Sequence, residues 1–125
     1  MTGERRAFTL IELLVVMAVI AMLLTIAVPR YFRSLQRSKE AVLMQDLTSL
    51  RESIDRFHGD TGKYPPTLAA LVEKHYLRAI PVDPIAKAAD RWSAVASEDA
   101  DDPGIKDVTS GAEGSGENGV PYAEW

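Results

Sequence analysis

The feature that most constrains this chain is an apolar segment of 21 residues, Phe8–Val28, whose only polar side chains are Thr9, Glu12 and Thr25. As an α-helix the segment would extend roughly 30 Å at about 1.5 Å per residue, which matches the hydrocarbon thickness of a bilayer. Glu12 stands out, because a carboxylate at membrane depth is costly and is rarely kept without a partner. The segment therefore predicts a membrane-spanning helix that carries one functional acid.

A cleavable secretory signal is the alternative interpretation of this segment. Its apolar part would be shorter, about 7–15 residues, and a cleavage site made of small residues would follow it. Here the apolar segment is longer, and it is followed by Pro-Arg-Tyr-Phe-Arg at positions 29–33, which is a poor site of that kind. A retained helix is therefore favoured.

Helical spacing of apolar residues continues beyond the membrane segment. An apolar stripe at helical spacing is formed by Leu43, Leu47, Leu50, Ile54 and Phe57, and charged residues occupy the other face of the helix. This is the pattern of an amphipathic helix. Because this periodicity resumes after Pro29, the proline is expected to kink the helix or to free a carbonyl rather than to end it. Two separate helices with a break at Pro29 are the alternative.

The residues after the stripe predict a small mixed α/β head. The glycines of Gly59–Gly62 predict the end of the helix, and Thr67 is a candidate N-cap for a short helix over Leu68–Tyr76. Alternation and turn residues predict three short strands, at Trp92–Ala96, Ile105–Ser110 and Val120–Trp125. The head has little apolar content of its own, so its sheet is expected to pack on the stripe. The expected fold class is α+β, with a long N-terminal helix packed against a small C-terminal antiparallel sheet.

Charge and composition exclude several functional classes. The net charge is −4, with +2 in residues 1–58 and −6 in residues 59–125, whereas a nucleic-acid-binding domain is usually basic. The chain has no cysteine, which excludes disulfides, zinc–thiolate sites and cysteine nucleophiles. The two histidines, His58 and His75, are isolated, and no nucleophile–base grouping or phosphate-binding Gly-Lys-Ser/Thr motif is present. The sequence does not predict an enzyme.

The segment Ala7-Phe8-Thr9-Leu10-Ile11-Glu12, after a short leader with Arg5 and Arg6, resembles the processing signal of the type IV pilin superfamily. That superfamily includes type IV pilins and type II secretion pseudopilins. The resemblance implies a leader at 1–7, a transmembrane and filament-core helix at 8–28, its amphipathic continuation at 29–58, and a globular extracytoplasmic head at 59–125. It also implies that a prepilin peptidase cuts between Ala7, where the family usually has Gly, and Phe8, and then N-methylates Phe8.

The head resembles the major, G-type, pseudopilin of type II secretion. The matching pieces are Gly62-Lys63-Tyr64-Pro65, the run Leu68–Leu77 followed by Ile80-Pro81-Val82-Asp83-Pro84, and Ile105–Gly114. Ile85-Ala86 stands where the family usually has Trp-Gly, and Glu113 where it often has Asp, so the subclass stays open.

The resemblance implies a structural subunit that assembles with identical copies into a pseudopilus and helps to export folded proteins. The implied partners are the prepilin peptidase, minor pseudopilins, the inner-membrane assembly platform and membrane lipid, with no nucleic acid. A type IV pilin for adhesion or motility, major or minor, is one alternative. A lone membrane-anchored domain is another.

Assembly is expected to depend on Glu12, Phe8 and Pro29. Cleavage would leave an α-amino group on Phe8, four residues from Glu12. In a filament, Glu12 of an incoming subunit is expected to pair with the Phe8 amine of a neighbour, since each charge is costly alone in a low-dielectric setting. Such a pair would also set the axial register between subunits. The alternative is that Glu12 merely extends to the membrane interface near the start of the helix.

The orientation in the membrane has two conflicting indications. The resemblance implies an inner-membrane subunit with a cytoplasmic N-terminus and a periplasmic head. The positive-inside rule predicts the reverse, because the basic residues after the membrane segment outnumber those before it: Arg30, Arg33, Arg37 and Lys39 against Arg5 and Arg6. We follow the resemblance, because a charge rule is statistical and the processing signal is specific.

A calcium site in the head is a further expectation that the resemblance implies. G-type pseudopilins bind Ca²⁺ in the loop after an Asp-x-x-Ser stretch, and the oxygen-bearing side chains available here are Asp107, Ser110, Glu113 and Glu117. Calcium takes six to eight oxygen ligands, from carboxylates and from carbonyls of a loop that glycine permits. A rival acidic cluster is formed by Asp99, Asp101 and Asp102. The spacing is not that of an EF-hand, and a solvated acidic loop is the simpler alternative.

Overall fold

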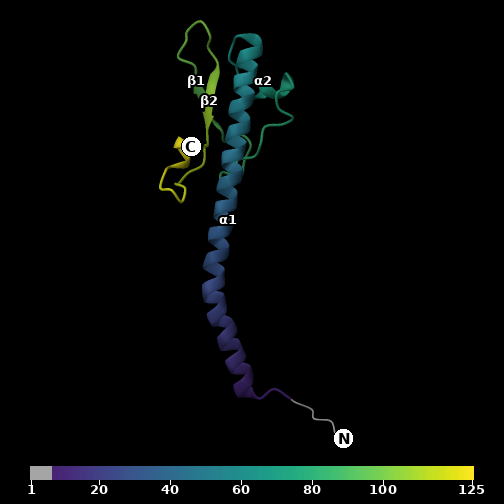
Figure 1. Ribbon diagram of the computed structural model, residues 1–125, viewed down its shortest axis with the longest axis vertical. Coiled ribbons are helices and arrows are strands. Elements are labelled where there is room, and N and C mark those ends of the chain that lie inside the picture. The colour runs from purple at the N-terminus through teal and green to yellow at the C-terminus, as the bar shows by residue number, and fades with distance from the viewer. Residues whose placement is uncertain (1–6) are drawn as a thin grey trace. The chain divides into compact units, whose positions relative to one another are not determined.

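The computed structural model describes residues 7–125, which form an α+β fold as predicted. Figure 1 shows a long helix α1 and a small sheet. The elements are α1 (Leu10–Thr61), α2 (Leu68–Glu73), β1 (Ser93–Ala96), β2 (Ile105–Thr109) and a 3₁₀ helix η1 (Tyr122–Glu124). The chain divides into two compact units, Met1–Gln36 and Arg37–Trp125. The leader 1–7, with Arg5 and Arg6, lies outside the described residues apart from Ala7.

Helix α1 is continuous through Pro29, so the alternative of two separate helices is wrong. Proline has no N–H to donate to the carbonyl four residues earlier, that of Thr25. The hydroxyl of Thr25 donates to the carbonyl of Ala21 at 2.8 Å. The predicted end is confirmed, since α1 stops at Thr61 and the N–H of Gly62, at φ +76°, donates to the carbonyl of His58 at 2.8 Å. A positive φ at this position is the usual glycine end of a helix.

The core of the second unit forms around one face of α1. The predicted stripe is confirmed, because Leu43, Leu47, Leu50 and Ile54 are fully buried and Phe57 is nearly so. Their partners come from α2, β2, η1 and the loops between the elements, and include Leu71, Trp92, Val108, Ala112 and Tyr122. Burying an aliphatic side chain of this size contributes about 1.5–3 kcal/mol. Helix α1 therefore supplies much of the apolar surface that holds the head.

The sheet has two antiparallel strands, with Ser93 opposite Thr109 and Val95 opposite Asp107. Its register shifts between Val95 and Ala96, which is a β-bulge or a similar irregularity. A two-stranded sheet is marginal alone in water, so it needs a covering surface. Here Val108 of β2 is fully buried in the cluster that α1 dominates. The predicted packing of the sheet on the stripe is confirmed.

Helix α2 begins where the sequence predicts and ends earlier. Thr67 is its N-cap, and its hydroxyl accepts the N–H of Ala70 at 3.2 Å. The helix ends at Glu73 rather than at Tyr76, because His75 adopts a left-handed φ of +66°. The next two N–H groups, of Tyr76 and Leu77, then fold back onto the carbonyl of Leu71 at 2.8 and 3.1 Å.

The predicted strand at Val120–Trp125 is wrong. Tyr122–Glu124 forms the 3₁₀ helix η1 after Pro121, and the strand-like contact is limited to a single bridge between Ser115 and Pro121. Proline cannot donate to a sheet ladder, so it stops strand pairing at this point. The turn instead buries the ring of Tyr122, which is 3% exposed, in the core.

Candidate functional site

The N-terminal end of α1 carries Glu12 in its first helical turn. The hydroxyl of Thr9 accepts the N–H of Glu12 at 3.0 Å, and the carbonyl of Thr9 accepts the N–H of Leu13 at 3.0 Å. Thr-x-x-Glu at this place is the sequence of a capping box, in which the acid belongs at the third helical position. A carboxylate there also lies near the positive end of the helix dipole. Thr9 is a residue that the site prediction had not included, although the Thr-x-x-Glu pattern identifies it.

The two residues of the predicted cleavage site lie before the helix. Ala7 and Phe8 are exposed and have no regular secondary structure, and the Phe8 side chain is 76% exposed. The peptide bond between them is therefore not locked in helical hydrogen bonds.

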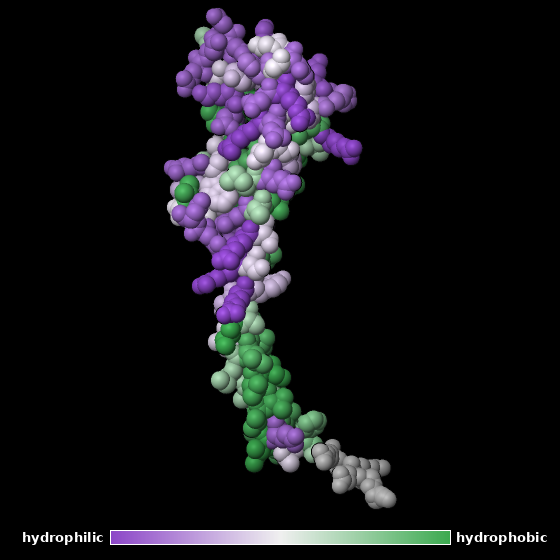
Figure 2. Space-filling view, in the orientation of Figure 1, coloured by the Kyte–Doolittle hydropathy of each residue, from purple (hydrophilic) through white to green (hydrophobic). Residues whose placement is uncertain are grey.

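The apolar residues between Leu10 and Val28 are exposed in the isolated chain. Large side chains such as Leu10, Ile11, Met22 and Ile26 are 60–80% exposed, and none in this stretch is buried. Figure 2 shows this part of α1 as a nearly continuous hydrophobic surface. Among the described residues, α1 is the one helix long and apolar enough to cross a membrane. An apolar surface of this extent marks a membrane or protein contact.

The four residues predicted to bind calcium do not converge on one point. Asp107 accepts the Nε of Arg51 at 2.9 Å, and Glu117 pairs with the Nε of Arg37 at 2.9 Å. Ser110 is buried, and Glu113 is exposed. Among residues 7–125 no three His, Cys, Asp or Glu side chains are placed to hold a metal ion together. Calcium binding by these residues stays a prediction.

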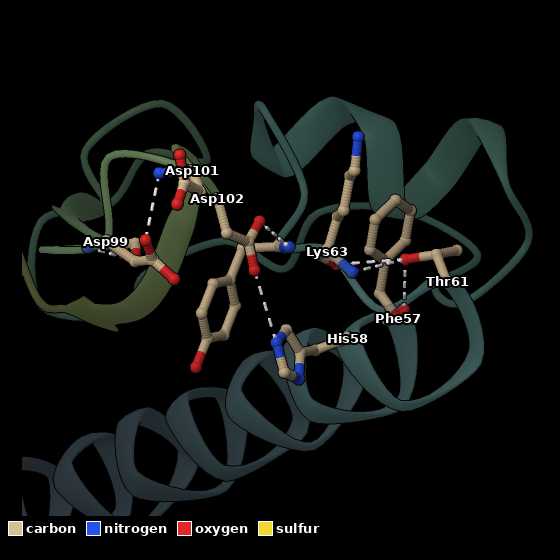
Figure 3. A network of polar contacts seen from close by, with 9 residues as sticks. Phe57, His58, Thr61, Lys63, Asp99, Asp101 and Asp102 are labelled. Atoms are coloured by element: carbon tan, nitrogen blue, oxygen red, sulfur yellow. Dashed lines mark hydrogen bonds and ion pairs between the residues drawn. The ribbon is translucent and has the colours of Figure 1, made fainter.

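The rival acidic cluster ties its loop to the end of α1 (Figure 3). Asp102 accepts the N–H of Tyr64 at 2.9 Å, and its other oxygen lies 3.4 Å from Nε2 of His58. The His58 ring stacks on Tyr64 with centroids 4.1 Å apart. Asp99 accepts the N–H of Asp101 at 3.0 Å, as a turn residue does. Asp102 therefore holds the loop against the end of α1, and Asp99 stabilises the turn within the loop.

A buried carboxylate, Asp83, is a feature that sequence reasoning missed as a site residue. It is 0% exposed, and one oxygen accepts the N–H groups of Ile85 and Ala86 at 2.9 and 3.0 Å. The other oxygen accepts the hydroxyl of Ser110 at 2.5 Å, and that hydroxyl oxygen accepts the N–H of Ala112. An Asp between two prolines is a turn signal, but the partner at position 110 is set by tertiary structure alone.

The pKa of Asp46, on α1, is affected by this buried charge. Partial burial, and then repulsion by the Asp83 carboxylate, raise the pKa of Asp46 above its ordinary value of 3.8. The two acids are 37 positions apart in the sequence, so no sequence pattern links them. The repulsion therefore acts between α1 and the buried carboxylate of the head.

Comparison with known proteins agrees with this architecture. Residues 4–28 match the family described as the prokaryotic N-terminal methylation motif. Type II secretion system core protein G of Klebsiella pneumoniae is 30% identical, with 65% of this chain and 69% of the relative covered. The protein of the same name from Dickeya chrysanthemi is 28% identical, with 67% and 65% covered, and that from Escherichia coli K12 is 27% identical, with 66% and 68% covered.

The chain spans slightly less than two thirds of the first relatives' length, 65% of the Dickeya protein and 62% of the Pectobacterium carotovorum protein. No solved structure gives a significant match. The matches to core protein G extend well beyond the N-terminal motif, into the head. The chain therefore belongs to the type II secretion core protein G family of pseudopilins and carries the N-terminal methylation motif of the type IV pilins.

Proposed function

We propose that this protein is a repeating structural subunit of a type II secretion pseudopilus, a helical filament that helps to export folded proteins. The observation that carries the proposal is the exposed apolar stretch of α1 from Leu10 to Val28, with one acid in its first turn. A surface of this kind needs a bilayer or other subunits to cover it. Identical subunits joined by heterologous contacts form an open helix.

Processing by a prepilin peptidase would prepare the subunit for assembly. The enzyme would cut between Ala7 and Phe8 and N-methylate Phe8. The support is the N-terminal methylation motif together with the exposed, non-helical backbone at these two residues.

Glu12 would act between subunits. Glu12 of an incoming subunit would pair with the new Phe8 amine of a neighbour, which offsets the cost of each charge in a low-dielectric core. Thr9 supports this role because it caps the helix at Glu12 and fixes the first turn. Pro29 would contribute by leaving the Thr25 carbonyl without its helical donor within the filament-core segment.

Before assembly the subunit would be stored in the inner membrane through residues 8–28, with its head in the periplasm. Other copies, minor pseudopilins and the membrane assembly platform would be its partners. Protease treatment of intact spheroplasts tests the orientation, because a periplasmic head is digested there. Protection of the head would contradict it.

Mass spectrometry of the mature N-terminus tests the processing step. We expect a chain that begins at N-methylated Phe8 and that requires the prepilin peptidase. An unprocessed Met1 would contradict this. Peptidase dependence would also exclude a lone membrane-anchored domain, and loss of secretion rather than of twitching motility in a deletion strain would exclude a type IV pilin.

Substitution of Glu12 tests the assembly role. Glu12→Gln should leave the protein in the membrane with a folded head and lower filament yield at least tenfold. Losing a close charge pair costs about 1.5 kcal/mol or more, which is tenfold in an equilibrium constant. Thr25→Val removes another polar group from the same segment and should assemble normally. Wild-type filament yield from Glu12→Gln would disprove the pairing.

A further inference from the structure

One arginine of α1 binds three oxygens of the C-terminal half of the head. The Nε of Arg51 donates to Asp107 at 2.9 Å. One terminal nitrogen of the same guanidinium donates to the main-chain oxygens of Val108 and Trp125, at 3.0 and 2.7 Å. The group therefore joins α1, β2 and the C-terminal segment at a single point.

Two further side chains of α1 hold the loop between β2 and η1. Arg37 pairs with Glu117 at 2.9 Å, and Glu40 accepts both the main-chain N–H of Glu117 at 3.1 Å and the hydroxyl of Tyr122 at 2.8 Å. Together with Arg51 these contacts occur at three levels along α1.

Three of the four residues expected to bind calcium are thus engaged by protein groups. Asp107 and Glu117 each face a guanidinium, and the Ser110 hydroxyl is held by Asp83. Calcium needs six to eight oxygens at 2.3–2.6 Å around one point. Here the oxygens gathered at Arg51 lie at 2.7–3.0 Å from nitrogen, the spacing of charge-assisted hydrogen bonds.

We propose that the guanidinium of Arg51 takes the place of a bound calcium ion in this head, so that the loop Ile105–Trp125 folds without a divalent cation. A single positive charge neutralises Asp107, and the planar donor group satisfies two main-chain oxygens as well. An exposed ion pair alone would contribute little, and the two side chains are 34% and 45% exposed. The shared contact with two main-chain oxygens makes this pair stronger. The proposal concerns how the head is stabilised and does not depend on filament assembly.

Thermal unfolding of the full-length protein in detergent micelles, followed by near-ultraviolet circular dichroism, tests the proposal. We expect the wild-type Tm to agree within about 1 °C in 1 mM CaCl₂ and in 1 mM EDTA. A calcium site occupied at a hundred times its Kd would instead raise Tm on the order of 10 °C. A rise of that size would overturn the proposal.

Substitutions provide the second arm of the experiment. Arg51→Gln should lower Tm by roughly 5–10 °C, because three oxygens lose a charged donor. Arg56→Gln, at an exposed arginine of the same helix, is the matched control and should change Tm by about 1 °C or less. An unchanged Tm in Arg51→Gln would refute the role of Arg51. If Arg51→Gln does not fold, Arg51→Lys replaces it in the experiment. The lysine keeps the positive charge but lacks the planar donor group, so Tm should fall by several degrees. An unchanged Tm in Arg51→Lys would also refute the role of Arg51.

Discussion

Removal of the buried carboxylate of Asp83 tests how the head is organised. Asp83→Ala would leave three donors without their acceptor: the N–H groups of Ile85 and Ala86 and the hydroxyl of Ser110. Asp83→Asn keeps one carbonyl oxygen in the position that accepts the two N–H groups. The pair of variants therefore separates the hydrogen bonds of this side chain from its charge.

The expected magnitude follows from these contacts. A buried donor left unpaired costs about 1–3 kcal/mol. Removing the buried charge of Asp83 offsets part of this loss, because the charged carboxylate no longer has to be desolvated on folding. We expect Asp83→Ala to lower the free energy of unfolding by about 3 kcal/mol, and Asp83→Asn by about 1 kcal/mol. For a unit of this size, 1 kcal/mol corresponds to roughly 4–8 °C in Tm. The alanine variant should therefore unfold on the order of 15 °C earlier.

Unfolding is measured on the full chain in detergent micelles by near-ultraviolet circular dichroism. Tryptophan fluorescence is an additional probe, because Trp92 is 8% exposed and donates to the carbonyl of Pro81 at 2.7 Å, and Trp125 packs against the same core cluster. A second readout is the pKa of Asp46 by NMR, which should fall in Asp83→Asn because the repelling charge is gone. If Asp83→Ala costs less than about 1 kcal/mol, or if Asn is as damaging as Ala, the reasoning is refuted.

Two further substitutions test single contacts of the head. The pKa of Asp46 is raised above 3.8 in the folded protein, so the charged form of Asp46 destabilises the fold at neutral pH. Asp46→Asn should therefore raise Tm at pH 7, and the gain in Tm should disappear below about pH 3.8, where Asp46 is protonated in both the folded and the unfolded state. Glu52→Gln, at an exposed acid of α1, is the control in the same pH series. If Asp46→Asn raised Tm by the same amount at every pH, the explanation would be contradicted. Gly111→Ala would place a Cβ 1.6 Å from the carbonyl oxygen of Arg91, so a loss of about 3 kcal/mol or more is expected by denaturant or thermal unfolding. Gly59→Ala, where nothing lies within 4 Å, should be neutral or slightly stabilising, and a tolerated alanine at position 111 would show that the two segments are not in close contact.

Much of the fold could be predicted because its signals are local. The apolar run, the stripe from Leu43 to Phe57 and the glycine end of α1 each reflect periodicity or backbone conformation within a few residues. The Thr67 cap is local in the same way. The wrong predictions concern segments in which the backbone departs from the local pattern. The 3₁₀ helix η1 replaces a strand because Pro121 has no N–H to donate to a neighbouring strand, and α2 ends early because His75 adopts a left-handed backbone conformation.

The candidate sites divide in the same way. The Thr-x-x-Glu start of α1 is a short pattern, so Glu12 and its cap can be found without a structure. The partners of Arg51 and Asp83 are 56 and 27 positions away, and no pattern in the sequence pairs them. The resemblance to G-type pseudopilins implied a calcium loop, whereas tertiary contacts with α1 pair two of its acids, Asp107 and Glu117, with arginines.

The sequence alone determined that this protein has an exposed apolar helix with a single acid, a charged amphipathic continuation and an acidic head, because composition and helical period do not depend on tertiary contacts. Tertiary structure decided how the head is held: which face of β2 meets α1, where Asp83 is buried, and that Arg51 gathers Asp107 with two main-chain oxygens. The physical reason is that burial and charge pairing depend on distances in space between residues that are far apart in the chain.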